Sequence, residues 1–152
     1  MSTKTVNVLG YANGEDQFVV KANNLNVRIS KNNNDKTLEG PSPLEYVLAG
    51  YAGCINAVGK LVAKEHGIDL KSLQVEISAT LSLDKYQGIE SNERAGFQKI
   101  NVGVKPTSEA SIEVLEAWIK EVEKRCPIHD NLINPTPLTL QLLPQYETAE
   151  VA

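Results

Sequence analysis

Hydrophobic and polar residues alternate along this chain with two different periods, one typical of strands and one typical of helices. The N-terminal third has the strand period: residues 4–10 precede an Asn13-Gly14 turn signal, residues 17–22 follow it, and residues 25–30 alternate apolar with polar side chains. A period of two marks a half-buried strand. The pattern therefore predicts three strands in this part of the chain.

A long helix is predicted to follow a polar loop. Ser42 is placed to cap it, Pro43 suits its first turn, and Glu45 completes an S-x-x-E capping box. The helix is expected to reach His66, because Gly67 offers a left-handed stop. At about 1.5 Å per residue such a helix is roughly 36 Å long.

The middle of this helix is apolar on nearly every side, which is typical of a buried helix. Small residues keep it thin and let other backbones approach closely. We therefore expect it to be covered by a sheet and by a second copy of itself, in a dimer that shares the core. The small residues are Ala49, Gly50, Ala52, Gly53, Ala57 and Gly59.

The second half of the chain repeats both periods. Residues 73–83 and 100–104 alternate as strands, 112–126 carry a helical stripe that Pro127 ends, and 138–143 read as a last strand. Strands and helices come in blocks, which indicates the α+β class. We expect a single domain over residues 1–145 and a flexible tail over 146–152.

Composition limits the kind of function. Fifteen Lys and Arg against 19 Asp and Glu give a net charge of −4, which argues against non-specific nucleic-acid binding. We expect no signal peptide, and the charge-free run 46–59 reads as too short to span a bilayer. With two cysteines and no secretion signal, a reducing cytoplasm is the expected compartment.

The two cysteines are the candidates for chemistry. Cys54 lies in the run AGYAGCIN, and Cys126 opens the segment CPIHDNL next to Arg125. A nearby cation favours the thiolate, which is the reactive form of cysteine. A buried cysteine also serves as a small hydrophobic residue, so an inert packing role stays open.

Two other kinds of site use the same residues. Cys54, Cys126, His66 and His129 offer four zinc ligands, but their spacings match no closed zinc module. A cysteine hydrolase needs a histidine beside the thiol. His66 lies more than three turns from Cys54 along the helix, whereas His129 could approach through the fold.

The carboxylate Glu45 has two interpretations. The capping box explains it fully. Within one helix it lies on the face opposite Cys54, about 13 Å away along the axis. If Glu45 serves the thiol, it does so across a dimer interface or through a bridging arginine, and Arg28 is either that bridge or a surface residue.

Taken together, these segments resemble the family of osmotically inducible protein C and organic hydroperoxide resistance proteins (OsmC/Ohr). The run GPSPLEYVLAGYAGCINAV is similar to the family's helix with proline, glutamate and cysteine, and CPIHDNL is similar to its second-cysteine segment. The order of elements agrees over nearly the whole chain.

The resemblance implies an intertwined α+β homodimer whose antiparallel sheets wrap around the long helix. It also implies a thiol peroxidase that needs no metal or organic cofactor. Cys54 would attack the peroxide and become a sulfenic acid, Cys126 would resolve it to a disulfide, and a small or protein-bound dithiol would reduce the disulfide. Glu45 would be the catalytic carboxylate.

Two positions depart from the organic hydroperoxide branch. Leu44 stands ten residues before Cys54, where that branch has its glutamate, and the early stretch YANGEDQ lacks the branch's arginine. Arg28 or Arg125 would have to replace that arginine. Two other functions stay open: a non-catalytic dimer that binds a small apolar ligand beside inert thiols, and a redox sensor.

Overall fold

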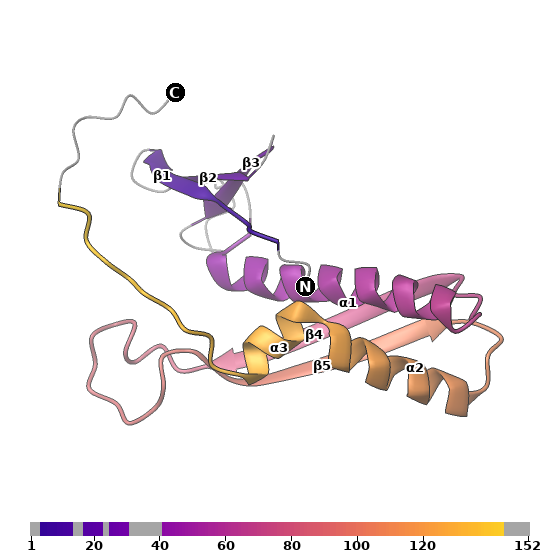
Figure 1. The fold of residues 1–152 in the computed structure, drawn as a ribbon. Helices are drawn as coiled ribbons and strands as arrows, with labels where there is room; N and C mark the ends of the chain where they lie inside the picture. The colour runs from indigo at the N-terminus through magenta and orange to yellow at the C-terminus, as the bar shows by residue number, and fades with distance from the viewer. Residues whose placement is uncertain (1–3, 14–16, 23–24, 31–40, 145–152) are drawn as a thin grey trace. The chain divides into compact units, whose positions relative to one another are not determined.

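The computed structural model describes residues 4–13, 17–22, 25–30 and 41–144 (Figure 1). The chain separates into two compact units, one of residues Met1–Val47 with Pro137–Ala152 and one of Leu48–Thr136. The single domain over 1–145 stays a prediction, and the predicted tail 146–152 lies outside the described residues.

The first unit contains a three-stranded antiparallel sheet in the order β1-β2-β3. β2 (Gln17–Ala22) and β3 (Leu25–Ser30) match their predicted bounds, and Val20 pairs with Val27. β1 covers Leu9–Asn13 and pairs Leu9 with Lys21, so the prediction of a strand at 4–10 was displaced toward the N-terminus. The apolar residues Val6 and Val8 before β1 are exposed, because no strand pairs with them in the described chain.

Helix α1 runs from Pro43 to Glu65 and begins with the predicted capping box. The backbone N–H of Ser42 donates to Glu45 Oε2 at 2.9 Å, and the N–H of Glu45 donates to Ser42 Oγ at 3.3 Å. Gly67 has a φ of +66°, the left-handed conformation that ends a helix, as expected. By length and composition alone α1 could also span a membrane, which the sequence interpretation did not foresee. A helix buried in a protein core has the same composition.

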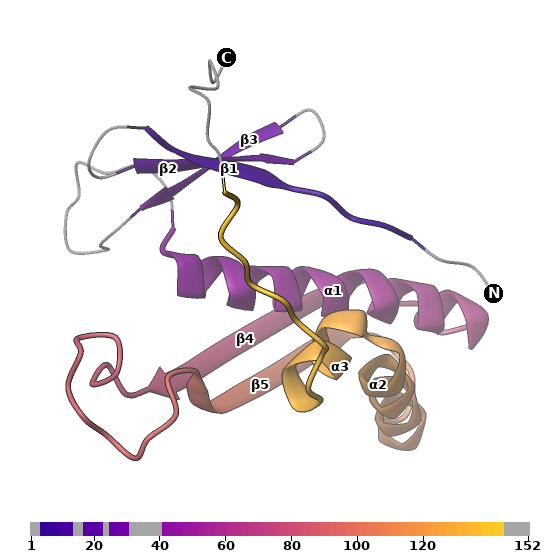
Figure 2. The same cartoon turned by 60° about the vertical axis from the view of Figure 1, so that its left-hand side comes forward.

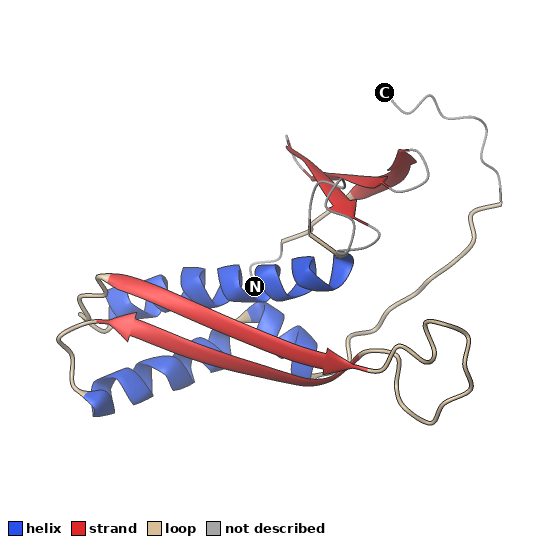
Figure 3. Cartoon of the chain, turned by 180° about the vertical axis from the view of Figure 1, so that it is seen from behind, coloured by secondary structure: helices blue, strands red, loops and turns tan. Residues whose placement is uncertain are grey.

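The second unit is built on a β-hairpin. β4 (Ser72–Leu81) and β5 (Phe97–Thr107) pair in antiparallel fashion, with Val75 opposite Val104 and Ile77 opposite Val102. These pairs lie on one face, and the helices cover that face (Figures 2 and 3). The alternation read from the sequence is therefore the alternation between a helix-covered face and an exposed one.

Helix α2 covers Ile112–Arg125, and a short helix α3 covers Pro127–Ile133. The sequence interpretation ended the helical stripe at Pro127 and did not predict α3. Proline lacks an N–H and stops α2, yet its fixed φ suits the first position of a new helix. Cys126 lies at this junction and is both the C-cap of α2 and the N-cap of α3.

The predicted last strand at 138–143 is wrong for this structure. Residues 135–143 form no helix or strand, and Leu138, Leu140 and Leu142 are 84%, 94% and 91% exposed. The alternation of leucines is present, but a strand also needs a neighbour to receive its backbone hydrogen bonds. No such neighbour is found within the described part of this chain.

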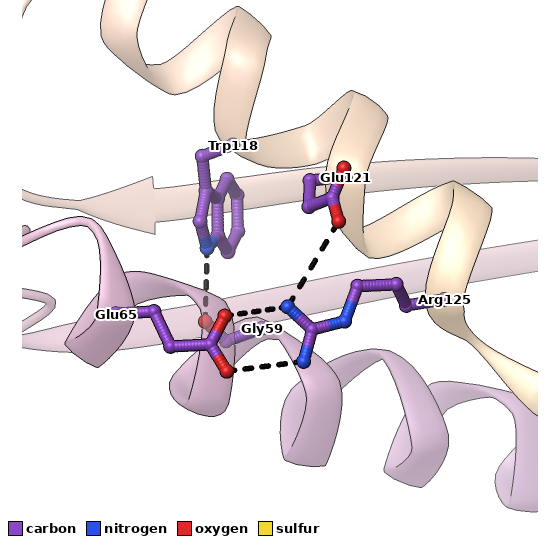
Figure 4. Close-up of polar contacts among 5 residues, drawn as sticks. All are labelled: Gly59, Glu65, Trp118, Glu121 and Arg125. Carbon is purple, nitrogen blue, oxygen red and sulfur yellow. Dashed lines mark hydrogen bonds and ion pairs between the residues drawn. The ribbon is translucent and has the colours of Figure 1, made fainter.

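The core of the second unit lies where α1 and α2 meet. Trp118 of α2 is 1% exposed, and its indole Nε1–H donates to the backbone oxygen of Gly59 at 2.9 Å (Figure 4). A Cβ at Gly59 would lie 3.1 Å from Cζ2 of Trp118, so glycine is what permits this approach. The buried residues around this contact are Tyr51, Ile55, Val62, Ala63, Ile68, Val122 and Cys126.

Replacing Gly59 by valine should lower the free energy of unfolding by about 1–3 kcal/mol, because the branched side chain forces the indole out of its site. Urea unfolding at fixed protein concentration measures this. The control is Lys60→Val at the exposed neighbouring position, which should cost about 0.5 kcal/mol or less. Equal losses in the two variants would contradict the packing described here.

Candidate active site

The two cysteines meet although they are far apart in the sequence. Their Sγ atoms lie 2.9 Å apart across a separation of 72 residues. Cys54 comes from the middle of α1 and Cys126 from the junction of α2 and α3, and both are free thiols. The structure therefore places the two predicted thiols in direct contact.

Cys126 is held by its double role as a helix cap. Its backbone N–H donates to Val122 O at 2.9 Å and closes α2. Its Sγ accepts from the backbone N–H of His129 at 3.5 Å and caps α3. Two helix ends thus fix the position of this sulfur, and its residue is 1% exposed.

The environments of the two sulfurs differ. Burial, together with the hydrogen bond to Cys54, raises the pKa of the Cys126 thiol, although the backbone N–H groups of His129 and Ile128 act in the opposite direction. Cys126 is thus the protonated partner, and its S–H points at the sulfur of Cys54. Cys54 is only partly buried, and its Sγ accepts this hydrogen bond.

An apolar cavity of about 180 Å³ adjoins Cys126. Its polar lining comes from Tyr51, Glu123 and His129. A second cavity, of about 250 Å³, shares Tyr51 and His129 with the first and extends toward Arg94 and Lys99. The apolar lining of the first cavity is formed by Ile55, Val102, Val104, Ile119 and Val122.

Tyr51 belongs to the site, and the sequence interpretation missed it. Its Oη lies 2.6 Å from His129 Nδ1, and His129 Nε2 lies 3.4 Å from Glu123 Oε1. Burial raises the pKa of Tyr51, as do the nearby Cys126, Glu123 and Cys54. The signal was available: Tyr51 stands three residues before Cys54 in the helix, and such residues share a face.

The candidate residues Glu45 and Arg125 have other partners in this chain. Glu45 is exposed and engaged with Ser42. Arg125 forms two hydrogen bonds to Glu65, at 2.5 and 3.1 Å, and lies 3.9 Å from Glu121 (Figure 4). These contacts lower the pKa of Glu65 and raise that of Arg125. Arg28 pairs with Val19 through the β2–β3 ladder, and its side chain lies outside the described residues.

The zinc arrangement is not formed. Among the residues that the structure describes, no group of three or more His, Cys, Asp or Glu could hold a metal ion. His66 follows the end of α1 and is exposed, while His129 contacts Tyr51. His66 and His129 therefore do not contribute to a common metal site.

Comparison with known proteins identifies the family. Residues 32–141 match the model of the OsmC-like protein family, so this chain belongs to the OsmC-like family. A protein of Mycoplasma pneumoniae named hydroperoxide reductase is 27% identical over 106 residues, which cover 70% of this chain and 72% of that protein.

Solved structures share the fold. The OsmC-like protein from Mycoplasma pneumoniae superposes with a TM-score of 0.77 at 23% identity, covering 88% of this chain and 91% of that one. The organic hydroperoxide resistance protein OhrB of Bacillus subtilis gives a TM-score of 0.55 at 22% identity, with 84% and 89% covered. The α+β class is thereby confirmed, as a mixture of helices and antiparallel sheets.

The raised pKa of Cys126 predicts slow alkylation. In a Cys54→Ser variant, where Cys126 is the remaining thiol, iodoacetamide at pH 7 should react about tenfold or more slowly than with a cysteine peptide, because burial disfavours the thiolate. The rate should climb as the pH rises past the ordinary thiol range. Intact mass against time gives the rates. Cys126→Ser, which keeps the more exposed Cys54, is the control and should react faster; a Cys126 that reacts like the peptide would refute the assignment.

Proposed function

We propose that this protein is a cysteine-based hydroperoxide reductase in which Cys54 attacks the peroxide and Cys126 resolves the product. The observation that carries the proposal is the 2.9 Å separation of two free sulfur atoms supplied by different helices. A disulfide can form between them with a small local movement. Inert packing does not require two thiols in contact.

The chemistry has three steps. The thiolate of Cys54 attacks a peroxide oxygen, the O–O bond breaks, and the other oxygen leaves as an alcohol after taking a proton. The sulfur of Cys126 then attacks the Cys54 sulfenic acid, so that an S–S bond forms and water leaves. A small or protein-bound dithiol reduces the disulfide by exchange.

The roles of the two cysteines follow from their surroundings. Cys54 is partly exposed, so a peroxide can approach it, and it accepts the hydrogen bond from the other thiol. Cys126 is buried and is therefore suited to an internal attack. Its position at two helix caps keeps the resolving sulfur beside its target.

The apolar cavity supports an alkyl or lipid hydroperoxide as substrate. Five of the residues that line it are Ile or Val, which favour a hydrocarbon chain over hydrogen peroxide alone. The names of two relatives point the same way, since one is a hydroperoxide reductase and the other an organic hydroperoxide resistance protein. The reaction needs no metal or organic cofactor, and a reducing cytoplasm would supply the dithiol.

We also propose that the protein acts as an intertwined homodimer. In α1, Gly50 and Gly53 are exposed, with no described atom within 4 Å of where a Cβ would stand. Leu61 of the same helix is 49% exposed. A second copy would bury this thin, apolar side of α1, and its Glu45 could then reach a cysteine of the first copy.

The alternative is a dimer that binds a small apolar ligand without catalysis. The same cavity supports it, because an apolar pocket of about 180 Å³ can hold a ligand whether or not the thiols react. The two functions differ in the fate of the thiols on exposure to peroxide.

One equivalent of cumene hydroperoxide should remove both thiols of the reduced protein within seconds and lower its mass by two hydrogens. Alkylation and intact mass measure both changes. In Cys54→Ser the remaining thiol should survive, whereas Cys126→Ser should give a sulfenic acid that dimedone traps. Two intact thiols after many minutes would contradict the peroxidase proposal and favour ligand binding.

Sedimentation equilibrium should give twice the chain mass of 16.6 kDa at micromolar concentration. Gly53→Leu should weaken association at least tenfold, because the side chain fills the space through which a second backbone approaches. Lys60→Leu on the same helix should associate like the wild type. A wild-type monomer under these conditions would refute the dimer.

A further inference from the structure

A line of polar side chains leads from the cavity beside Cys126 to the surface. It consists of Tyr51, which is 7% exposed, His129, whose side chain is 18% exposed, and Glu123, whose side chain is 62% exposed. The links are 2.6 Å from Tyr51 Oη to His129 Nδ1 and 3.4 Å from His129 Nε2 to Glu123 Oε1. The three groups come from α1, α3 and α2, so only the folded chain assembles them.

The carboxylate fixes the direction of these contacts. An ionised Glu123 can only accept, so Nε2 of His129 carries the hydrogen that faces it. In the neutral imidazole, Nδ1 is then the acceptor, and the hydroxyl of Tyr51 donates to it. The lone pairs of the Tyr51 oxygen are left as acceptors for a third group.

The thiol of Cys126 is the candidate for that third group. Tyr51 stands one helical turn before Cys54 on the same face of α1, and it lines the cavity beside Cys126. In the resting structure Tyr51 Oη is hydrogen-bonded to His129 and the S–H of Cys126 to Cys54, so the relay requires this S–H to turn toward the cavity that Tyr51, His129 and Cys126 all line.

We propose that Tyr51 and His129 form a relay that removes the proton of the Cys126 thiol when this cysteine resolves the Cys54 sulfenic acid. The relay rests on the peroxidase function proposed above. Once Cys54 carries the sulfenic acid, the S–H of Cys126 turns from Cys54 to the Tyr51 oxygen. The thiol proton passes to that oxygen while the hydroxyl proton of Tyr51 passes to His129 Nδ1, which leaves an imidazolium facing Glu123. The Cys126 sulfur attacks, the S–O bond of Cys54 breaks, and the leaving hydroxide takes a proton from solvent. The imidazolium then returns its proton to solvent at the exposed end of the line.

This site requires a group that accepts the proton of the Cys126 thiol. A buried, protonated thiol is a poor nucleophile, and deprotonation must precede or accompany its attack. Arg125, the neighbour of Cys126 in the sequence, is engaged by Glu65 instead. Positioned proton transfer of this kind accelerates a step by about 10²–10⁴-fold.

The relay ends on the ring of His129. The charged and titratable groups around it are Tyr51 from α1, Glu123 from α2 and Cys126 at the N-cap of α3. Arg94 and Lys99 line the second cavity on the side of β5.

The test separates the two chemical steps. Reduced protein is mixed with one equivalent of cumene hydroperoxide between about pH 5.5 and 9. It is quenched at successive times with dimedone, which traps sulfenic acid, and analysed by intact mass. His129→Gln and Tyr51→Phe should each slow disulfide formation about ten- to hundredfold, so that trapped sulfenic acid accumulates. His66→Gln, at the other and exposed histidine, should behave like the wild type.

The double variant tests whether Tyr51 and His129 act in the same proton transfer. If they do, Tyr51→Phe with His129→Gln is no slower than the slower single variant. Disulfide formation at the wild-type rate in both single variants, or losses that multiply in the double variant, would overturn the relay. If His129→Gln fails to fold by circular dichroism, Glu123→Gln at the exposed end replaces it and should slow the same step. A wild-type protein that yields neither sulfenic acid nor disulfide would overturn the peroxidase proposal and the relay together.

Discussion

The contact between Trp118 and Gly59 is the constraint on which the rest of the second unit depends. The indole donates to the Gly59 carbonyl and lies where a larger residue at position 59 would put its side chain. This fixes how closely α1 and α2 approach. Because Cys54 lies on α1 and Cys126 caps the end of α2, the same packing determines whether the two sulfurs can touch. The chemistry of the site is thus a consequence of one glycine–tryptophan contact more than a turn away along each helix.

Much of the fold could be predicted because its signals are local. The capping box, the left-handed Gly67 and the alternation in β4 and β5 each depend on residues within a few positions of one another. The pairing of Cys54 with Cys126 is a long-range contact, and it was reached only through the resemblance to a family. Periodicity alone placed each cysteine on its helix and could not bring the two together.

The misses have physical reasons of the same kind. Helix α3 was not predicted because Pro127 was interpreted as the end of a helix, although proline also suits the first turn of a new helix. The strand predicted at 138–143 depends on a neighbour that a single sequence does not reveal. Arg125 was a candidate for the thiol, but Glu65 is sixty residues away in sequence and close in space. Tyr51 was interpreted as one residue of an apolar helix. Its hydroxyl gains a hydrogen-bond partner only when the fold brings His129 beside it.

The closeness of the two sulfurs also bears on how such a site withstands excess oxidant. A disulfide bond is about 2.05 Å long, so sulfurs that start 2.9 Å apart need to approach by only about 0.9 Å. A sulfenic acid that is captured this readily has little time to meet a second peroxide and become an irreversible sulfinic acid. In the proposed reaction, the first oxidation would therefore be followed by a protective disulfide before it becomes permanent damage.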